Sequence, residues 1–271
     1  MKVGIIGSGG REHSICHSLK KSNKVNEIYC FPGNAGTAKI AKNIQLNTKN
    51  FTSLKNFILK KKIDLIIVGP EKPLVDGIVD FLEKYNIKVF GPNKLSSQLE
   101  GSKIFTKKLC KKYNIPTAKF GIFTKKKDAE FFIKNSKYPL VIKADGLASG
   151  KGVYICDKIK DAKIAITEIF EGKFGEARNL LIEEFLKGEE MSYFIVSDGK
   201  TIKNFGTAQD HKRVLENDKG KKKTDGPKFN GQISFCSNHK SMSESQVRIL
   251  LVTEYCIDEK DTYTFCLKSS A

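Results

Sequence analysis

Short apolar runs alternate with amphipathic stretches through the N-terminal third of the chain, and this alternation limits the possible folds more than any other feature. The apolar runs are typical of buried strands and lie at 3–6, 27–31, 64–68 and 88–90. Helical patterns separate them at 11–20, at 52–61 with Thr52 as the expected cap, and at 73–85 with Pro73 in the first turn. Continuous apolar strands alternating with helices are typical of a parallel sheet with helices on both faces. We therefore predict an α/β domain with a doubly wound parallel sheet over residues 1–93.

After residue 93 the pattern changes, and the expected strands and helices become shorter. A helix is expected over 94–113, within a connecting segment that reaches 117. The next strands are expected at 119–123, 140–143, 153–156 and 180–185, and the next helices end near 135 and span 160–170. We predict a small α+β subdomain over 118–189, followed by strands at 191–196 and 201–205 that begin an incomplete central domain over 190–218. Residues 219–271 show little periodicity, and the pattern assigns them no fold.

The formal net charge of +18 suggests nucleic acid as a partner. However, only four of the 48 basic residues are arginines, and arginine is the side chain that pairs bidentately with guanine edges. The lysine runs at 60–62, 125–127 and 221–223 are therefore interpreted as solvated faces, and we expect no nucleic-acid partner. A lysine-rich nucleic-acid binder is kept as an alternative.

The seven cysteines form no Cys-x-x-Cys pair and have no histidine cluster beside them. An odd count without metal-ligand spacing predicts free thiols in a reducing, cytoplasmic compartment. No run of about 18 apolar residues occurs, so we expect no membrane span. The apolar run at the N-terminus is too short for a signal peptide.

A glycine-rich turn, Gly7-Ser8-Gly9-Gly10, stands between the first expected strand and the first expected helix. Glycines there let backbone N–H groups approach a phosphate at a helix N-terminus. The dinucleotide fingerprint fails, because Glu12 occupies its last glycine position and no acidic residue closes the second strand. This motif supports a phosphate site and a tight turn without a ligand equally.

A second glycine-rich loop spans 146–152 and lacks the spacing of a Walker A motif. Such a hairpin can close over nucleotide phosphates through its backbone N–H groups, although the loop alone supports a plain turn equally. Lys143 favours the phosphate interpretation, because it ends an apolar strand and a buried ammonium needs an anionic partner.

Two polar clusters are weaker signals. Glu183 and Glu184 continue an apolar strand, and Glu190 follows nearby. A strand edge and a carboxylate can bind adenine and ribose, but exposed glutamates on an edge strand explain this cluster better in isolation. Residues 209–213, Gln-Asp-His-Lys-Arg, form a polar turn for which a solvated loop is favoured in isolation.

Eight motifs follow one another in a set order along the chain, and together they are specific although each alone is weak. They are G-S-G-G-R-E-H at 7–13, P-G-N-A-G-T at 32–37, G-P-E-x-P-L-V at 69–75, F-G-P at 90–92, Q-L-E-G-S-K at 98–103, K-A-D-G-L-A-S-G-K-G at 143–152, E-E-F-L-x-G-E-E at 183–190 and Q-D-H-K-R at 209–213. With these motifs the chain resembles the phosphoribosylamine–glycine ligase (glycinamide ribonucleotide synthetase) family of ATP-grasp enzymes over about residues 1–218. The resemblance implies that the small α+β subdomain is an ATP-grasp lid.

The resemblance also implies a ligation in de novo purine biosynthesis. ATP phosphorylates the glycine carboxylate, the amine of 5-phosphoribosylamine attacks the glycyl phosphate, and glycinamide ribonucleotide, ADP and phosphate are released. The implied cofactors are ATP and Mg²⁺ (or Mn²⁺), and the implied partners are the two small substrates of a monomeric enzyme. Alternatives are another ATP-grasp carboxylate–amine ligase and a nucleotide-binding remnant without catalysis.

The family's site residues carry over to matching positions. The residues implied for the ATP phosphates are Lys103, Lys143, Ser149, Gly150, Lys151 and Gly152. Those implied for adenine and ribose are Glu183, Glu184, Phe185, Leu186 and Glu190. Those implied for phosphoribosylamine are Gly9, Gly10, Gly33, Asn34, Gly36 and Glu71, and those for catalysis are Lys143, Asp210 and Arg213.

The chain departs from the family pattern after residue 213. A lysine-rich stretch replaces the family's D-x-G-P-N-T-G-G-M-G-A segment, and its later metal-binding E-x-N is absent. We therefore expect a chain that is truncated and divergent after about residue 218, with unknown metal ligands. We expect weak ATP binding without measurable product, unless Glu254, Asp258 or Glu259 supplies the metal site.

Overall fold

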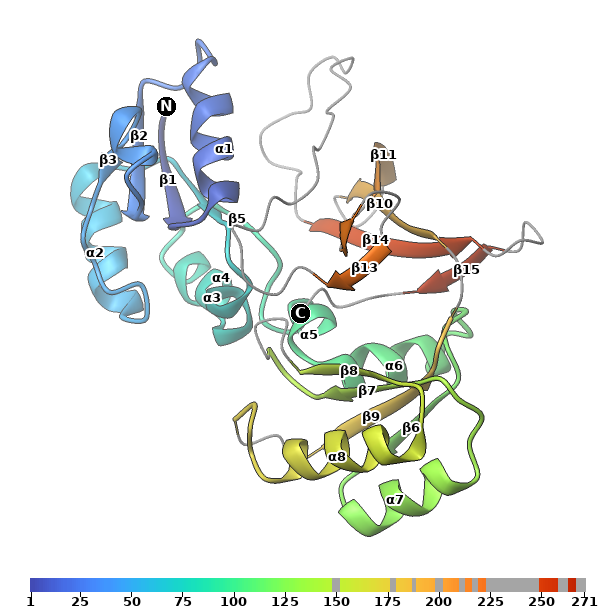
Figure 1. Ribbon diagram of the computed structural model, residues 1–271. Coiled ribbons are helices and arrows are strands. Elements are labelled where there is room, and N and C mark those ends of the chain that lie inside the picture. Colours follow the sequence, from blue (N-terminus) through green and yellow to red (C-terminus); the bar gives the residue numbers. More distant parts are fainter. Residues whose placement is uncertain are drawn as a thin grey trace. The chain divides into compact units, whose positions relative to one another are not determined.

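The structure is a computed structural model, and Figure 1 shows its ribbon. It describes residues 1–147, 152–175, 179–186, 189–197, 202–209, 213–215, 219–222, 249–257 and 263–266. The chain forms two compact units, of which the first takes Met1–Gly101 and the second takes most of the chain from Ser102 onward. Within the described residues, no helix is both long and apolar enough to cross a membrane.

The first unit is built on a five-stranded sheet in the order β3-β2-β1-β4-β5. Its strands are β1 (Lys2–Gly7), β2 (Glu27–Pro32), β3 (Lys42–Asn43), β4 (Leu65–Val68) and β5 (Val89–Phe90). Each pair is parallel, and Ile5 of β1 lies between Cys30 of β2 and Ile67 of β4. The predicted parallel sheet is therefore confirmed.

Helices cover both faces of this sheet. On one face, α1 (Gly10–Lys20) packs Cys16 against Ile5. On the other, α2 (Phe51–Lys61) and α4 (Ile78–Glu83) pack around Ile66. The short helices α3 (Glu71–Asp76) and η1 (Thr37–Lys39) follow β4 and β2. Burial on both faces explains why β1, β2 and β4 are largely apolar. The edge strand β3 consists of Lys42 and Asn43, and no strand was predicted there.

Two expected helices are each interrupted by one residue. The stretch at 73–85 forms α3 and α4, because Gly77 between them adopts a φ of +92°. The stretch at 94–113 forms α5 (Gln98–Gly101) and α6 (Lys103–Lys112). Ser102 separates these two in an extended conformation, and its Oγ accepts the Phe105 N–H at 3.1 Å. Apolar spacing therefore predicts the helical turns but not the residue that ends them.

The cap of α2 also differs from the prediction. Asn50, rather than Thr52, caps the helix, and its Oδ1 accepts the Ser53 N–H at 3.0 Å. Thr52 lies inside the first turn and is exposed. Asparagine is among the best N-cap residues, so the earlier start is physically reasonable.

The second unit contains an antiparallel sheet in the order β6-β9-β7-β8. Its strands are β6 (Phe120–Phe123), β7 (Leu140–Ala144), β8 (Val153–Cys156) and β9 (Leu180–Glu184). Helices α7 (Lys126–Lys134) and α8 (Ile159–Phe170) cover one face of it, where Ile166 packs with Ile142 and Ile182 (Figure 1). Side chains alternate along a strand, so Lys143 and Glu183 belong to the opposite face.

Further strands lie beyond this sheet in the sequence. A second sheet has the order β11-β10-β14-β15, and a separate pair joins β12 to β13. These strands are β10 (Glu189–Ser197), β11 (Ile202–Gln209), β12 (Arg213–Leu215), β13 (Lys219–Lys222), β14 (Ile249–Ile257) and β15 (Tyr263–Cys266). The predicted strands at 191–196 and 201–205 are confirmed, and β11 continues to Gln209. The last three strands lie in the region for which the pattern assigned no fold.

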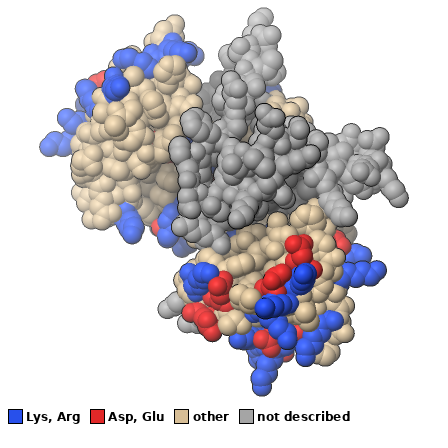
Figure 2. Space-filling view, viewed as in Figure 1, with Lys and Arg blue, Asp and Glu red and all other residues tan. Residues whose placement is uncertain are grey.

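Charged side chains are interspersed on the face shown in Figure 2, with acidic groups between the lysines of the second unit. The lysine runs at 60–62 and 125–127 are exposed, as predicted for solvated faces. Surface ion pairs occur as well, such as Lys42 Nζ with Glu27 Oε2 at 2.7 Å and Lys173 Nζ with Glu168 Oε2 at 2.7 Å.

Candidate functional site

Three charged side chains lie in a row in the second unit, and we call Lys107, Glu183 and Lys143 the buried charge row. Glu183 of β9 stands in the middle. Its Oε2 lies 2.7 Å from Lys143 Nζ of β7, and its Oε1 lies 3.0 Å from Lys107 Nζ of α6. The side chains of Glu183 and Lys107 are each 4% exposed, and that of Lys143 is 14% exposed. This burial distinguishes the row from the ion pairs at the surface.

The row changes two interpretations made from the sequence. Glu183 is buried on an interior strand, so an exposed position on an edge strand is wrong. The anion that contacts Lys143 in the structure is the Glu183 carboxylate, so the need for a counter-ion does not by itself require a phosphate. Sequence reasoning missed Lys107. It stands four residues after Lys103 in an expected helix, and this spacing puts both lysines on one helix face.

Two opposing effects set the ionisation of Glu183. Burial raises the pKa of its carboxyl, but the ammonium groups of Lys143 and Lys107 together lower this pKa by more than burial raises it. The pKa of Glu183 therefore lies below its usual value. The carboxylate is therefore charged at neutral pH. Two ammonium groups and one carboxylate give the row a net charge of +1, which suits an anionic ligand.

Helix α6 also fixes the start of the second glycine-rich loop. Lys103 Nζ donates a 2.9 Å hydrogen bond to the Gly146 carbonyl. The Asp145 carboxylate accepts hydrogen bonds from Ser102 Oγ at 3.0 and 3.1 Å and from the Ile104 N–H at 3.2 Å. The two lysines predicted for the ATP phosphates thus lie on the two elements that meet where this loop begins.

The segment predicted to hold adenine, residues 183–186, continues from β9. The Glu184 N–H donates to the Lys119 carbonyl at 3.0 Å, and the Glu184 carboxylate accepts the Lys119 N–H at 2.8 Å. These two bonds attach the segment to the residue that precedes β6. Phe185 and Leu186, the next two residues, are half-buried.

Other predicted ATP and catalytic residues are described only in part. Gly152 is buried, and its carbonyl accepts the Ala144 N–H at 2.8 Å. The structure gives the backbone positions of Glu190 in β10 and Arg213 in β12. Four predicted residues lie outside the described residues, and their roles stay predictions: Ser149, Gly150, Lys151 and Asp210.

In the first unit, Asn34 links residues predicted to hold phosphoribosylamine. Its Nδ2 donates to the Ser8 and Gly9 carbonyls at 2.8 and 3.1 Å. Its Oδ1 accepts the Gly36 and Thr37 N–H groups at 2.8 and 2.9 Å. These bonds join the loops that follow β1 and β2. Because parallel α/β sheets bind ligands beyond the carboxyl ends of their strands, this is a reasonable place for a small substrate.

The neighbouring residues complete this edge of the sheet. The Gly33 N–H donates to the Gly7 carbonyl at 3.1 Å, and Gly10 begins α1. Glu71 accepts a 2.9 Å hydrogen bond from Arg11, a residue that the sequence analysis did not include in the site. The structure therefore brings the six predicted residues to the carboxyl edge of one sheet.

A buried carboxylate explains several glycines at this edge. Glu12 is 5% exposed, and its Oε2 accepts the Gly9 N–H at 2.6 Å. A Cβ at Gly7 would lie 2.6 Å from the Glu12 side chain, and a Cβ at Gly69 would lie 2.0 Å from its Oε1. Gly7 also has a φ of +131°, which favours glycine. The turn encloses an internal carboxylate that accepts the Gly9 N–H, a contact that does not depend on a ligand.

Comparison with known proteins shows which family the chain belongs to. The model for the phosphoribosylglycinamide synthetase N domain matches residues 1–100, and the model for the ATP-grasp (A) domain of the same synthetase matches residues 101–258. The chain belongs to the phosphoribosylglycinamide synthetase family. The match to the synthetase A domain continues beyond residue 218, where the motif resemblance ended.

Relatives in the synthetase family are similar over most of this chain. A phosphoribosylamine–glycine ligase from Caldanaerobacter subterraneus is 41% identical over 96% of this chain and 62% of its own length. One from Mesorhizobium japonicum is 47% identical over 81% of this chain and 52% of its own length. The chain therefore spans between half and two thirds of these curated relatives.

Solved structures with a similar fold include a member of the synthetase family. The ligase from Thermotoga maritima matches 98% of this chain and 68% of its own, with 27% identity and a TM-score of 0.74. An N5-carboxyaminoimidazole synthase from Aspergillus clavatus, solved with ADP and an aminoimidazole ribonucleotide, has a TM-score of 0.68 over 98% of this chain and 68% of its own. At 15% identity it supports the fold alone.

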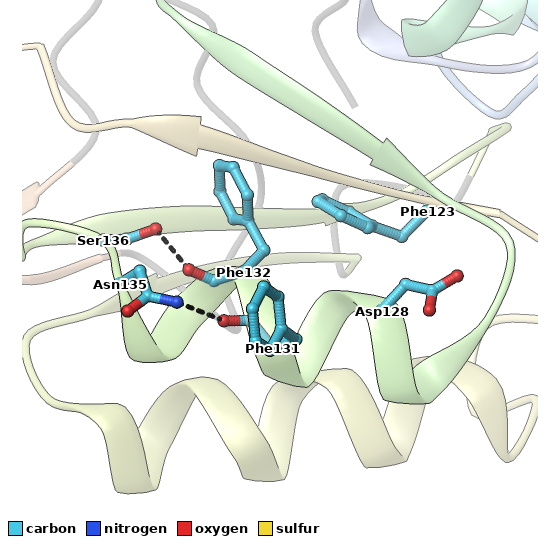
Figure 3. A pocket seen from close by; sticks show the side chains of 6 residues that line it. All are labelled: Phe123, Asp128, Phe131, Phe132, Asn135 and Ser136. Carbon is cyan, nitrogen blue, oxygen red and sulfur yellow. Dashed lines mark hydrogen bonds between the residues drawn. The ribbon is translucent and has the colours of Figure 1, made fainter.

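A pocket in the second unit is lined by none of the predicted site residues. It measures about 410 Å³ and is lined by Phe123 and by residues of α7 and the turn after it: Asp128, Phe131, Phe132, Asn135 and Ser136 (Figure 3). Asn135 and Ser136 donate hydrogen bonds to the carbonyls of Phe131 and Phe132 at 3.4 and 2.8 Å. The only charged group in the lining is the carboxylate of Asp128, so this pocket does not suit a nucleotide phosphate.

Proposed function

We propose that this chain binds ATP in its second unit and is of the enzyme type that ligates glycine to 5-phosphoribosylamine. We expect no measurable product from this chain unless Glu254, Asp258 or Glu259 supplies the metal site. The observation that carries the proposal is the buried, net cationic row, whose Lys143 lies on the strand that leads to Gly146, in a chain of this family. In this proposal Lys103 and Lys143 hold the phosphates, and residues 149–152 close over them. Residues 183–186 hold the adenine, and Glu190 holds the ribose.

The proposed chemistry has two steps. A glycine carboxylate oxygen forms a bond to the γ-phosphorus of ATP while the bond to ADP breaks. The amine of 5-phosphoribosylamine then attacks the glycyl carbonyl, loses a proton and displaces phosphate. The lysines stabilise the negative charge on the phosphates, and the closed loop keeps water from the acyl phosphate. Asp210 and Arg213 assist this chemistry, and the amine substrate binds at Gly9, Gly10, Gly33, Asn34, Gly36 and Glu71.

A divalent metal, Mg²⁺ or Mn²⁺, belongs to the proposal through the family. When bound with ATP, such an ion would neutralise phosphate charge. Within the described residues, no group of three or more His, Cys, Asp or Glu side chains is placed to hold a metal ion. The described residues do not form a metal site, so we assign no ligand and derive no step through the ion.

A reducing, cytoplasmic setting is also part of the proposal. The described cysteines that support it are buried and form no disulfide with one another: Cys16, Cys30, Cys110 and Cys156. Burial raises the pKa of the Cys156 thiol to about 11, so this thiol stays protonated and unreactive at neutral pH.

Calorimetric titration with ATP and ADP tests the nucleotide site. We expect weak but measurable binding, and Lys143→Ala should lower the affinity by about tenfold or more, because a hydrogen bond to a charged group contributes about 1.5–3 kcal/mol. An unchanged affinity would contradict the site. An ADP-release assay with freshly made phosphoribosylamine tests the reaction. Release that depends on glycine, and not on other amino acids, distinguishes this ligase from other ATP-grasp ligases.

A further inference from the structure

The buried charge row connects three elements of the second unit through one carboxylate. Glu183 of β9 contacts Lys143 of β7 at 2.7 Å and Lys107 of α6 at 3.0 Å. The register of the sheet pairs Val141 with Glu183 and Lys143 with Leu181, so Glu183 and Lys143 are diagonal neighbours on one face. Removing one partner from a buried ion pair leaves an uncompensated charge, which is strongly unfavourable. The number of cations that contact Glu183 therefore determines whether its carboxylate is left unpaired when one of them moves away.

The two lysines are held differently. Lys107 Nζ also donates to Thr117 Oγ1 at 2.6 Å and to the Ala118 carbonyl at 3.4 Å, and it lies 5.4 Å from the centroid of the Phe120 ring. These contacts fix Lys107 in place. Within the described part of the chain, Glu183 is the partner found for Lys143 Nζ. Lys143 is therefore the cation that can turn toward a ligand.

We propose that Glu183 and Lys107 are positioning residues for Lys143. Glu183 holds the Lys143 ammonium in place, and Lys107 is the permanent counter-ion that lets Lys143 leave. When Lys143 turns to a nucleotide phosphate, Glu183 keeps Lys107 as its partner and is not left buried and unpaired. This inference rests on the proposed nucleotide site, in which residues 183–186 hold the adenine through their backbone groups. It assigns a function to the Glu183 side chain and to Lys107, which is not part of that site.

The inference predicts that a second substitution, at Glu183, restores the ADP affinity lost by a first substitution at Lys107. In Lys107→Met, the carboxylate keeps only Lys143, and nucleotide binding must break that remaining pair. We expect the ADP affinity to fall by about tenfold, the loss of one charged hydrogen bond. Removing the carboxylate as well, in Lys107→Met/Glu183→Gln, frees Lys143 and should restore most of the affinity. A purely structural role predicts the opposite, because a second core substitution would add to the damage.

The control variants separate charge from position. Lys107→Arg keeps the cation and should bind ADP nearly as the unmodified chain does. Lys111→Met removes the same unit of charge from an exposed site on the same helix and should not change the affinity. Circular dichroism checks that each variant is folded, and Lys107→Gln replaces Lys107→Met if the latter does not fold.

A second measurement does not depend on nucleotide. Acetic anhydride labels accessible lysine amines, and mass spectrometry reports the extent of labelling at Lys143 in the ligand-free chain. We expect faster labelling in Glu183→Gln and slower labelling in Lys107→Met than in the unmodified chain. Equal labelling in all three would overturn the positioning role. If labelling changes as expected but Lys143→Ala leaves ADP binding unchanged, the nucleotide site is wrong. If Lys143→Ala weakens ADP binding and Lys107→Met does not, the counter-ion role of Lys107 is wrong.

Discussion

At the scale of single residues, Glu183 predicts how stability depends on pH. Burial raises the pKa of Glu183, but Lys143 and Lys107 lower it by more, so the pKa lies below its usual value of 4.5. A carboxyl with a lowered pKa stabilises the folded state above the pKa of the unfolded chain, and this stabilisation disappears as the pH falls through the folded pKa. The unfolding midpoint in urea should therefore exceed that of Glu183→Gln at pH 7, and the difference should shrink below about pH 4.5. A difference that stays constant with pH would contradict this.

The cap of α2 gives a second prediction at this scale. Asn50→Ala removes the acceptor of the Ser53 N–H and should lower the free energy of unfolding by about 1 kcal/mol. Thr52→Ala is the matched control, because Thr52 is exposed inside the same first turn. It should change stability by less than about 0.5 kcal/mol. Urea unfolding of the two variants compares them directly, and a larger loss in Thr52→Ala would mean that the cap assignment is wrong.

Residue chemistry in the sequence identified Lys143 and Glu183, but not how they are partnered. A charged residue in an apolar strand indicates that a counter-ion is near, whereas the identity of that counter-ion depends on the register between β7 and β9. Glu12 was similarly visible as a break in a glycine motif. Its role as the carboxylate enclosed by Gly7 and Gly69 depends on how the ends of β1 and β4 come together.

At the scale of elements, α8 predicts a strong contrast between two isoleucines. Ile166 is fully buried against the β6-β9-β7-β8 sheet, whereas Ile164 on the same helix is 50% exposed. Ile166→Ala should lower the free energy of unfolding by about 2–5 kcal/mol, because it leaves a cavity in the core. Ile164→Ala should cost less than about 1 kcal/mol. Similar losses in both variants would contradict the orientation of α8.

Element types were predictable from periodicity, but their ends were not. The two expected helices at 73–85 and 94–113 are each interrupted at a residue whose backbone conformation or side-chain hydrogen bond is not helical. Gly77 adopts a left-handed conformation at little cost, and Ser102 donates its hydroxyl to Asp145, 43 residues away. The second of these is a tertiary contact, so no local pattern could reveal it.

At the scale of the whole molecule, the parallel sheet of the first unit was the most predictable feature. Its strands β1, β2 and β4 are buried on both faces and therefore carry a continuous apolar signal. The edge strand β3, Lys42–Asn43, is polar and was not predicted. The later strands gave weaker signals. Lys219–Lys222, for example, is a strand composed of lysines and one glycine, a composition that does not predict a strand.

The net charge of +18 leads to a prediction for the whole chain. Many exposed lysines should give weak, nonspecific binding to duplex DNA at low salt, because basic groups displace counter-ions from the phosphates. On the face shown in Figure 2, acidic groups lie between the lysines of the second unit and interrupt any continuous basic surface there. We therefore expect a steep loss of binding with salt, and no measurable complex with a mixed-sequence duplex at about 0.15 M salt and micromolar protein. Fluorescence anisotropy with a labelled duplex measures this. Tight binding at that salt concentration, with a preference among duplex sequences, would favour the nucleic-acid alternative over the ligase.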